Sequence, residues 1–369
     1  MVHNIAQKVD KLGMPKMVMD AYNVDESVDY NKIVKKFGAS LIDDKLAKKI
    51  DHPLVPSLYF AHRDFDKIIE KDFALITGRG PSLNMHIGHL LLFKFMKDLQ
   101  DKFDVPVFIP FSDDEKLLAR GLTIDHVVKM DYENLLDIIA MGFKPDKTEI
   151  MMDLVNMKQE MYNLAMDISS HMTANTVRSA MGFTGENNIG IQFYPAMQAA
   201  HILYPTKKFG VPTVVPIGVD QDVFVKLTRD IAEKVGLPKP GDILGKFLPG
   251  LTGTKMSSSK PETAIFTTDD EATVKKKLWN AFTGGRDTAE EHRNLGGETE
   301  KCVVCQYHKI FFQNDKIVKK CGAGKILCGE SKQVLFKDIM TMLKDHQKKR
   351  EKAKDVVHEF VPELAGFKE

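Results

Sequence analysis

Short apolar runs alternate with helical patterns through the middle of the chain, and this alternation restricts the possible folds more than any other feature. The runs Phe73–Thr77, Val105–Ile109 and Pro212–Ile217 have the length and apolar content of strands buried on both faces. One further strand lies at Ile150–Met152. Four helical patterns lie at Leu90–Leu99, Tyr132–Met141, Asn156–Ser170 and Ala196–Leu203. Because strands and helices alternate, we predict an α/β fold with a Rossmann-like, doubly wound parallel sheet.

Three polar or glycine-rich turns follow strands of this predicted sheet. They are Gly78–His89, Ser112–Glu115 and Gly218–Asp222. In doubly wound sheets, ligands bind beyond the carboxyl ends of the strands. We therefore expect these three turns to meet at the active site.

The character of the chain changes on both sides of the alternating region. Residues 1–65 are polar and rich in lysine, with short helical patterns at Tyr30–Phe37 and Asp43–Ile50, so we predict an appended N-terminal segment. After the serine-rich stretch near residue 257, strand patterns stop and helical patterns separated by glycines follow. We predict a catalytic domain over 66–268 and an all-α C-terminal domain over 269–369.

The charge and the apolar pattern exclude some classes of protein. The formal net charge is +1, so there is no global attraction to nucleic acid, and such a partner would have to bind local patches. No apolar run is long enough to span a membrane, and Met1–Asn4 does not begin a signal peptide. We expect a cytoplasmic protein that does not bind membranes.

The four cysteines are Cys302, Cys305, Cys321 and Cys328. Two residues separate the first pair, which is a zinc-ligand spacing. Six residues separate the second pair, whereas paired zinc ligands are typically separated by two to four. We therefore expect reduced, partly buried thiols and predict no structural metal.

Two motifs suit the handling of ATP phosphates. The first, His86–His89, joins two histidines through Gly88 at a strand-to-helix turn, where a helix N-terminus attracts anions. The second, Lys255–Ser259, sets a lysine beside three hydroxyls between glycines. Attack on the α-phosphorus of ATP gathers negative charge that imidazoles, an ammonium and backbone amides can stabilise. Together the histidine motif (His86–His89) and the serine loop (Lys255–Ser259) predict nucleotidyl transfer.

The two motifs resemble the HIGH and KMSKS signatures of the class I aminoacyl-tRNA synthetases. Within that class the chain is similar to the tryptophanyl-tRNA synthetases of the archaeal and eukaryotic type. The similar segments include Ala61–Asp64, Thr77–Ser82, Asp113–Lys116, Val219–Asp222, Gly284–Asp287 and Glu291–Arg293. The resemblance implies a tryptophan–tRNA ligase that uses ATP and Mg²⁺, forms tryptophanyl-adenylate, transfers tryptophan to the 3′ end of a tRNA, and is a homodimer.

The resemblance also implies roles for individual residues. The catalytic residues are expected to be His86, His89, Lys255 and Ser257. ATP-binding residues are expected to be Gly78, Arg79, Gly80, His86, Gly88, His89, Lys255, Met256, Ser257, Ser258 and Ser259. The amino-acid site is expected to contain Ile76, Glu115, Gln198, His201 and Gln221. In the family the helical domain binds the anticodon, so Arg286 and Asp287 are expected to contact tRNA.

The expected side-chain pocket departs from the family pattern. Archaeal and eukaryotic members carry a Tyr and a Gln that partner the indole N–H, where this chain has Ile76 and Pro110. Bacterial members use an Asp, where this chain has His201. A buried indole N–H without an acceptor would cost about 1–3 kcal/mol. We predict that neutral His201 accepts this hydrogen bond; the alternative is that His201 is a helix residue that hydrogen-bonds a neighbouring residue and has no part in recognition.

Two other functions stay open. A diverged paralogue would bind ATP and tRNA but would have lost or changed its amino-acid specificity, as the residues at Ile76, Pro110 and His201 allow. A small-molecule nucleotidylyltransferase would also use paired histidines. Such enzymes usually lack both a Lys-Met-Ser-x-Ser loop and a long helical C-terminal domain.

Overall fold

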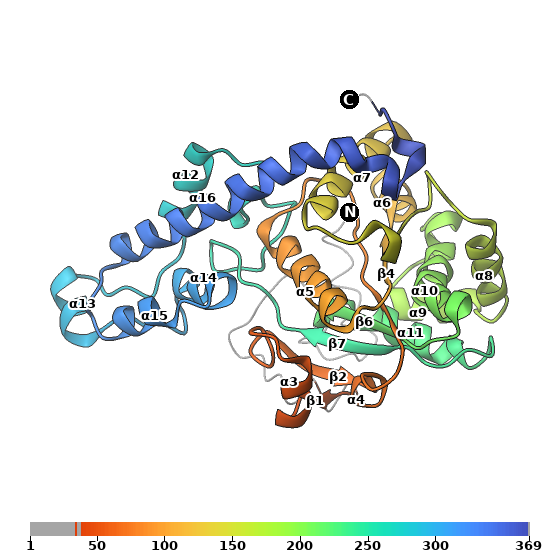
Figure 1. Ribbon diagram of the computed structural model, residues 1–369, viewed down its shortest axis with the longest axis horizontal. Coiled ribbons are helices and arrows are strands. Elements are labelled where there is room, and N and C mark those ends of the chain that lie inside the picture. The colour runs from red at the N-terminus through yellow and green to blue at the C-terminus, as the bar shows by residue number, and fades with distance from the viewer. Residues whose placement is uncertain (1–33, 35–37, 368–369) are drawn as a thin grey trace.

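The predicted sheet forms the centre of the molecule (Figure 1). The computed structural model describes Val34 and residues 38–367. Seven strands form one sheet in the order β1-β2-β7-β6-β3-β4-β5. Their bounds are β1 Ser40–Leu41, β2 Tyr59–Arg63, β3 Ala74–Ile76, β4 Val107–Phe111, β5 Thr148–Met152, β6 Thr213–Gly218 and β7 Gly241–Gly245. Strands β7, β6, β3, β4 and β5 are parallel, so the predicted doubly wound sheet is confirmed.

Helices cover both faces of the parallel strands, because successive strand residues point to opposite faces. In β4, Val107 and Ile109 pack in one core with helices α5 and α7. Phe108 packs in a second core on the other face, with α8, α10 and α11. The bounds are α5 Ile87–Phe103, α7 Ile124–Ala140, α8 Gln159–Ser170, α10 Ile189–Phe209 and α11 Asp222–Ala232. With both faces covered, a ligand reaches the sheet at the strand ends.

The N-terminal part of the described chain joins this sheet, which differs from the predicted appended segment over 1–65. Strand β2 pairs antiparallel with β7, and β1 pairs with β2. The helix predicted at Asp43–Ile50 is α3 (Asp44–Ile50), and its apolar side chains belong to the core that contains α5. The pattern at Tyr30–Phe37 lies outside the described residues, apart from Val34.

A buried ion cluster explains how this polar segment becomes part of the sheet. Arg63 at the end of β2 pairs with Asp242 of β7 and, at 2.6 Å, with Asp222 at the start of α11. All three side chains are buried. Two carboxylates thus neutralise the guanidinium, which lets a charged residue occupy the interior. A short helix, α4 (Phe65–Ile68), then leads to β3.

The C-terminal part is helical, as predicted, and no strand follows β7 in the described residues. Its helices are α12 Glu271–Trp279, α13 Ala289–Leu295, α14 Val303–Phe312, α15 Asp315–Gly322, α16 Cys328–Ala353 and α17 Val357–Phe360. Helix α16 runs back along the molecule to α7 (Figure 1). There His346 lies 2.9 Å from Asp137 of α7, and Arg350 lies 3.0 Å from the same carboxylate. No helix in the described part is both long and apolar enough to cross a membrane.

Candidate active site

The histidine motif stands at the turn between β3 and α5. His86 has an extended backbone and caps α5, and its backbone N–H donates to His89 Nδ1 at 3.1 Å. The two rings stack with centroids 3.6 Å apart. His86 Nδ1 is buried, and among the residues that the structure describes it has no hydrogen-bond partner. A helix N-terminus therefore presents two fixed imidazoles, one of them with a nitrogen free for a ligand.

Both imidazoles are neutral at physiological pH. Burial, followed by the nearby charge of Arg79, lowers the pKa of His86 to about 3. The same two causes, together with His86, place the pKa of His89 well below its ordinary value. Arg79 is itself fixed, because its Nε donates to Asn134 Oδ1 at 2.6 Å and its Nη2 donates to Leu83 O at 2.9 Å. The histidines can therefore act by donating N–H groups, while Arg79 supplies positive charge behind them.

The histidine motif and the serine loop are in contact. A Cβ at Gly88 would lie 2.8 Å from Met256 Sδ, so glycine allows the loop to approach the helix. The chain after the loop pairs with the chain before α5: Ile87 N–H donates to Ile265 O, and Thr267 N–H donates to Met85 O, each at 3.0 Å. Gly88 thus has a structural task between the two motifs in addition to its predicted role in ATP binding.

Lys255 connects the serine loop to the third turn. Its ammonium lies 2.8 Å from Asp220 Oδ2, in the turn after β6, and 5.2 Å from the centre of the Phe247 ring. Ser257 and Ser259 share a hydrogen bond of 2.9 Å between their hydroxyls. The loop thus places its cation and hydroxyls at the carboxyl edge of the sheet, where the sequence predicts the active site.

Two glycines of the first turn allow close approach of neighbouring groups. A Cβ at Gly78 would lie 3.1 Å from Pro110 O, and one at Gly80 would lie 2.3 Å from Lys116 Cε. Lys116 also pairs with Glu115. The segment Ser112–Glu115, predicted as a turn, is the N-cap and first turn of α6 (Asp113–Arg120). The first and second turns therefore touch, as expected.

A cavity of about 460 Å³ opens beside these turns. It is lined by Ile76, Thr77, Gly78, Pro110, Ser112, Tyr194, Gln198, His201, Ile202, Val215, Ile217, Gln221, Phe224 and Val225. Four of the five residues predicted to bind the amino acid line it, whereas Glu115 does not. Gln198 Oε1 is buried without a partner, so the cavity offers an acceptor that nothing in the described chain uses. Most of the lining is apolar or aromatic, as a bulky side chain needs.

His201 is the main polar group among these apolar walls. It is 2% exposed, and its Nε2 lies 2.9 Å from Asp153 Oδ1. Burial by itself would lower the pKa of His201, but the carboxylates of Asp153, Asp114 and Asp113 outweigh burial and raise it. Burial and the neighbouring Asp153 in turn raise the pKa of Asp114 to about 8. The base of the cavity is therefore an acidic cluster that fixes one imidazole.

Asp153 is the residue of this site that the sequence reading missed. It follows β5 directly, so its position after a strand was a usable signal. The three aspartates Asp113, Asp114 and Asp153 lie close enough together to hold a metal ion. Asp113, however, already accepts backbone N–H groups from Asp114, Asp153 and Leu154. Mg²⁺ usually enters with substrate phosphates, and the cluster lies beside His201 rather than beside Lys255.

The sequence model of the family described as tRNA synthetases class I (W and Y) matches residues 68–344, which carry both motifs. The chain belongs to this synthetase family. The predicted family, Rossmann-like core and helical C-terminal region are thereby confirmed.

Named relatives resemble this synthetase over nearly their whole length. The tryptophan–tRNA ligase of Pyrobaculum calidifontis is 43% identical over 93% of this chain and 96% of its own length. That of Thermococcus onnurineus is 42% identical over 94% of each chain. Among solved structures, tryptophanyl-tRNA synthetase from Giardia lamblia has a TM-score of 0.81 at 33% identity, covering 94% of this chain and 98% of that one. The Encephalitozoon cuniculi enzyme bound to tryptophan has a TM-score of 0.83 at 30% identity, covering 92% and 99%.

The two residues of the synthetase predicted to contact tRNA lie on the helical part. Arg286 donates from Nε to Gly296 O at 3.0 Å and pairs with Glu298 at 2.9 Å. Its guanidinium therefore braces a glycine-rich loop, whereas Asp287 is exposed. Contact of either residue with tRNA stays a prediction.

Proposed function

We propose that this synthetase is a tryptophan–tRNA ligase. The observation that carries the proposal is the His201–Asp153 pair, whose imidazole lines a mostly apolar cavity. The pair supplies a fixed imidazole where the side chains of Ile76 and Pro110 offer no acceptor for an indole N–H. The names of the relatives support the same substrate.

In this proposal, Asp153 selects the tautomer of His201. When the imidazole is neutral, Nε2–H donates to Asp153, and Nδ1 remains as an acceptor for the indole N–H. Gln198 Oε1, which has no partner, and Gln221 are placed to bind the ammonium and carboxyl groups of the amino acid. Recognition of tryptophan thus uses one directed hydrogen bond within apolar walls.

The reaction joins a tryptophan carboxylate oxygen to the α-phosphorus of ATP, while the bond to pyrophosphate breaks and pyrophosphate leaves. Neutral His86 and His89 donate N–H groups to the phosphate oxygens. Lys255 moves from Asp220 to the leaving pyrophosphate, where its charge matters most in the transition state. Mg²⁺, bound through the ATP phosphates, would neutralise part of the same charge.

The adenylate then passes tryptophan to the 3′-terminal hydroxyl of a tRNA, and AMP leaves. We expect tRNA to bind along the helical part that carries Arg286 and Asp287. We also expect the enzyme to be a cytoplasmic homodimer. The tRNA contacts and the homodimer are expected from the family resemblance, and the cytoplasmic location is expected from the sequence pattern.

Exchange of labelled pyrophosphate into ATP, measured with each of the twenty amino acids in turn, tests the proposal. We expect exchange with tryptophan and at least about 100-fold slower exchange with tyrosine or phenylalanine, because a site built around one hydrogen bond rejects ligands that lack it. Exchange with another amino acid, or with none, would favour the diverged paralogue.

A further inference from the structure

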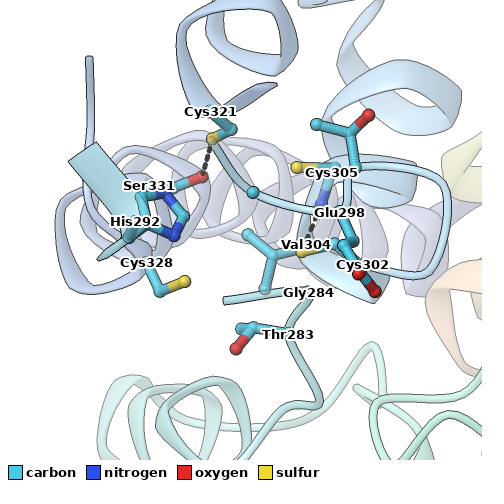
Figure 2. A pocket seen from close by; sticks show the side chains of 12 residues that line it. Thr283, Gly284, His292, Glu298, Cys302, Val304, Cys305, Cys321, Cys328 and Ser331 are labelled. Carbon is cyan, nitrogen blue, oxygen red and sulfur yellow. Dashed lines mark hydrogen bonds between the residues drawn. The ribbon is translucent and has the colours of Figure 1, made fainter. Parts of the chain in front are cut away.

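All four cysteines of the chain surround one hollow in the helical part. Cys302 caps α14 and Cys305 lies in the first turn of that helix. Cys321 lies at the end of α15, and Cys328 is the first residue of α16. The hollow is small, and Figure 2 shows the four side chains arranged around it. Three helices thus bring together thiols that the sequence spacing seemed to keep apart.

The thiols are free, and three of the four are buried. Cys302 Sγ accepts the backbone N–H of Cys305 at 3.5 Å, and the Cys305 thiol interacts with those of Cys302 and Cys321. Cys321 Sγ donates to Ser331 Oγ at 3.5 Å. No three of the four sulfurs in this described part lie within 4.8 Å of one another. The thiols therefore face one space without filling it.

Glycines and one histidine keep the rest of the wall open. A Cβ at Gly285 would lie 2.8 Å from Cys328 Sγ, so any other residue there would displace the thiol. His292 also lines the hollow, and its Nε2 lies 3.1 Å from Ile326 O. A histidine that donates one N–H to a backbone carbonyl keeps its other nitrogen as an acceptor, which is the arrangement found beside metal ions.

A buried lysine lies beside this hollow. Lys332 is 9% exposed, and its ammonium donates to Trp279 O at 2.7 Å and Ala281 O at 2.9 Å. It also lies within electrostatic reach of Cys302 and Cys328. Metal centres held by four thiolates carry net negative charge, which a fixed ammonium nearby stabilises.

We propose that Cys302, Cys305, Cys321 and Cys328 form a four-thiolate site for a thiophilic metal centre, either a zinc ion or an iron–sulfur cluster. Each thiol that binds releases its proton to water as the metal–sulfur bond forms. Around one zinc ion, with bonds of about 2.3 Å, tetrahedral sulfurs lie about 3.8 Å apart, so zinc would require the thiols to close in. A 4Fe–4S cluster binds each thiolate through a different iron and needs a wider spacing.

Such a metal centre would hold the helical part against the serine loop. Cys302, Cys305 and Cys321 belong to the same apolar core as Ile87 and Met256 of the two motifs. From the middle of α14, Tyr307 donates its hydroxyl to Pro249 O at 3.0 Å, at the base of the serine loop. We therefore expect the metal to stabilise the fold without taking part in adenylate chemistry.

Metal analysis of the intact protein tests the site directly. The full chain is purified without chelators or metal-affinity resin under anaerobic conditions, and zinc, iron and acid-labile sulfide are measured per chain. About one zinc, or iron with equivalent sulfide, is expected. Cys302→Ser and Cys328→Ser should each lower metal content at least about ten-fold. Thr283→Val, which changes a lining residue that is not a thiol, should keep it.

A second measurement does not depend on the folding of variants. Reduced wild-type protein is freed of metal and titrated with Co²⁺, or is reconstituted anaerobically with ferric iron, sulfide and a thiol that supplies the electrons for partial reduction of the iron. We expect a sulfur-to-cobalt charge-transfer band that saturates at about one equivalent, or a cluster absorption band. Wild-type protein that contains no metal and gives neither band would overturn the proposal, as would unchanged metal content in the cysteine variants. Neither result bears on the tryptophan proposal.

Discussion

Single residues decide the chemistry of this enzyme, and several could be recognised from the sequence. The histidine motif and the serine loop were predicted from residue type and position, and the structure brings them into contact through Gly88 and Met256. Asp153 was missed although it follows the edge strand β5 directly, because that position alone does not distinguish a site residue from a turn or cap residue. Its importance depends on a residue 48 positions away, His201, which only the fold brings near.

At this scale, Lys255→Ala should lower kcat for pyrophosphate exchange by about 100-fold to 1,000-fold, the usual cost of removing one transition-state donor. The Km for tryptophan should change little, because Lys255 contacts Asp220 rather than the cavity lining. Steady-state exchange kinetics with varied tryptophan separate the two parameters. A raised Km with an unchanged kcat would assign Lys255 to amino-acid binding instead.

The His201–Asp153 pair predicts a pH dependence with a definite sign. The pKa of His201 is raised, and below that pKa the imidazolium has no acceptor for an indole N–H. Therefore kcat/KM for tryptophan should rise as pH increases through the pKa of His201. His201→Ala should abolish this rise and relax selectivity towards an analogue in which sulfur replaces the indole N–H, while the Km for ATP stays unchanged. If the variant has the same pH profile and selectivity as the wild-type enzyme, His201 has only a structural role.

Secondary-structure elements show where sequence patterns mislead. The parallel strands β3, β4 and β6 were predicted because apolar runs mark strands covered on both faces. Strand β2 was missed because it ends in His62 and Arg63, and β7 because it contains glycines and Asp242. The charged side chains of Arg63 and Asp242 are tolerated in the interior because they form an ion pair with each other. Neither segment alone shows that this pair forms.

The ion cluster between β2, β7 and α11 therefore gives a prediction about stability. Arg63→Met should lower the free energy of unfolding by about 3–5 kcal/mol, because buried Asp242 loses its ion pair and buried Asp222 keeps only Lys226. Lys67→Ala, which removes an exposed pair with Asp64, is the control and should cost less than about 1 kcal/mol. Urea denaturation of both variants supplies the comparison. Equal stability of the two would show that Arg63 does not hold the sheet edge.

At the scale of the whole molecule, the helical part is continuous with the catalytic core. Helix α16 reaches α7 through His346 and Arg350, and Asp137 of α7 also accepts a hydrogen bond from Thr267 after the serine loop. Apolar residues after α16 pack in the core that contains α5 and α7. The division at residue 268 thus stays a prediction about chain segments. The fold class was predictable because it follows from local alternation, whereas these long-range contacts were not.

The gathering of four cysteines is also a property of the whole fold. The spacing of six residues between Cys321 and Cys328 argued against a metal, because most known motifs place ligand pairs on one short turn. Here the end of α15 and the start of α16 supply one thiol each. Spacing along the chain does not show that the four thiols gather around one hollow, and whether they bind a metal stays a prediction.

Transfer of tryptophan to tRNA is the proposed task of the whole molecule, and it can be measured directly. Purified enzyme is incubated with ATP, labelled tryptophan and total tRNA, and the charged tRNA is separated on an acid gel and sequenced. We expect one tRNA species, with a tryptophan anticodon, carrying label at its 3′ end. Adenylate formation without charged tRNA, or tRNA charged only with a different amino acid, would contradict this proposal.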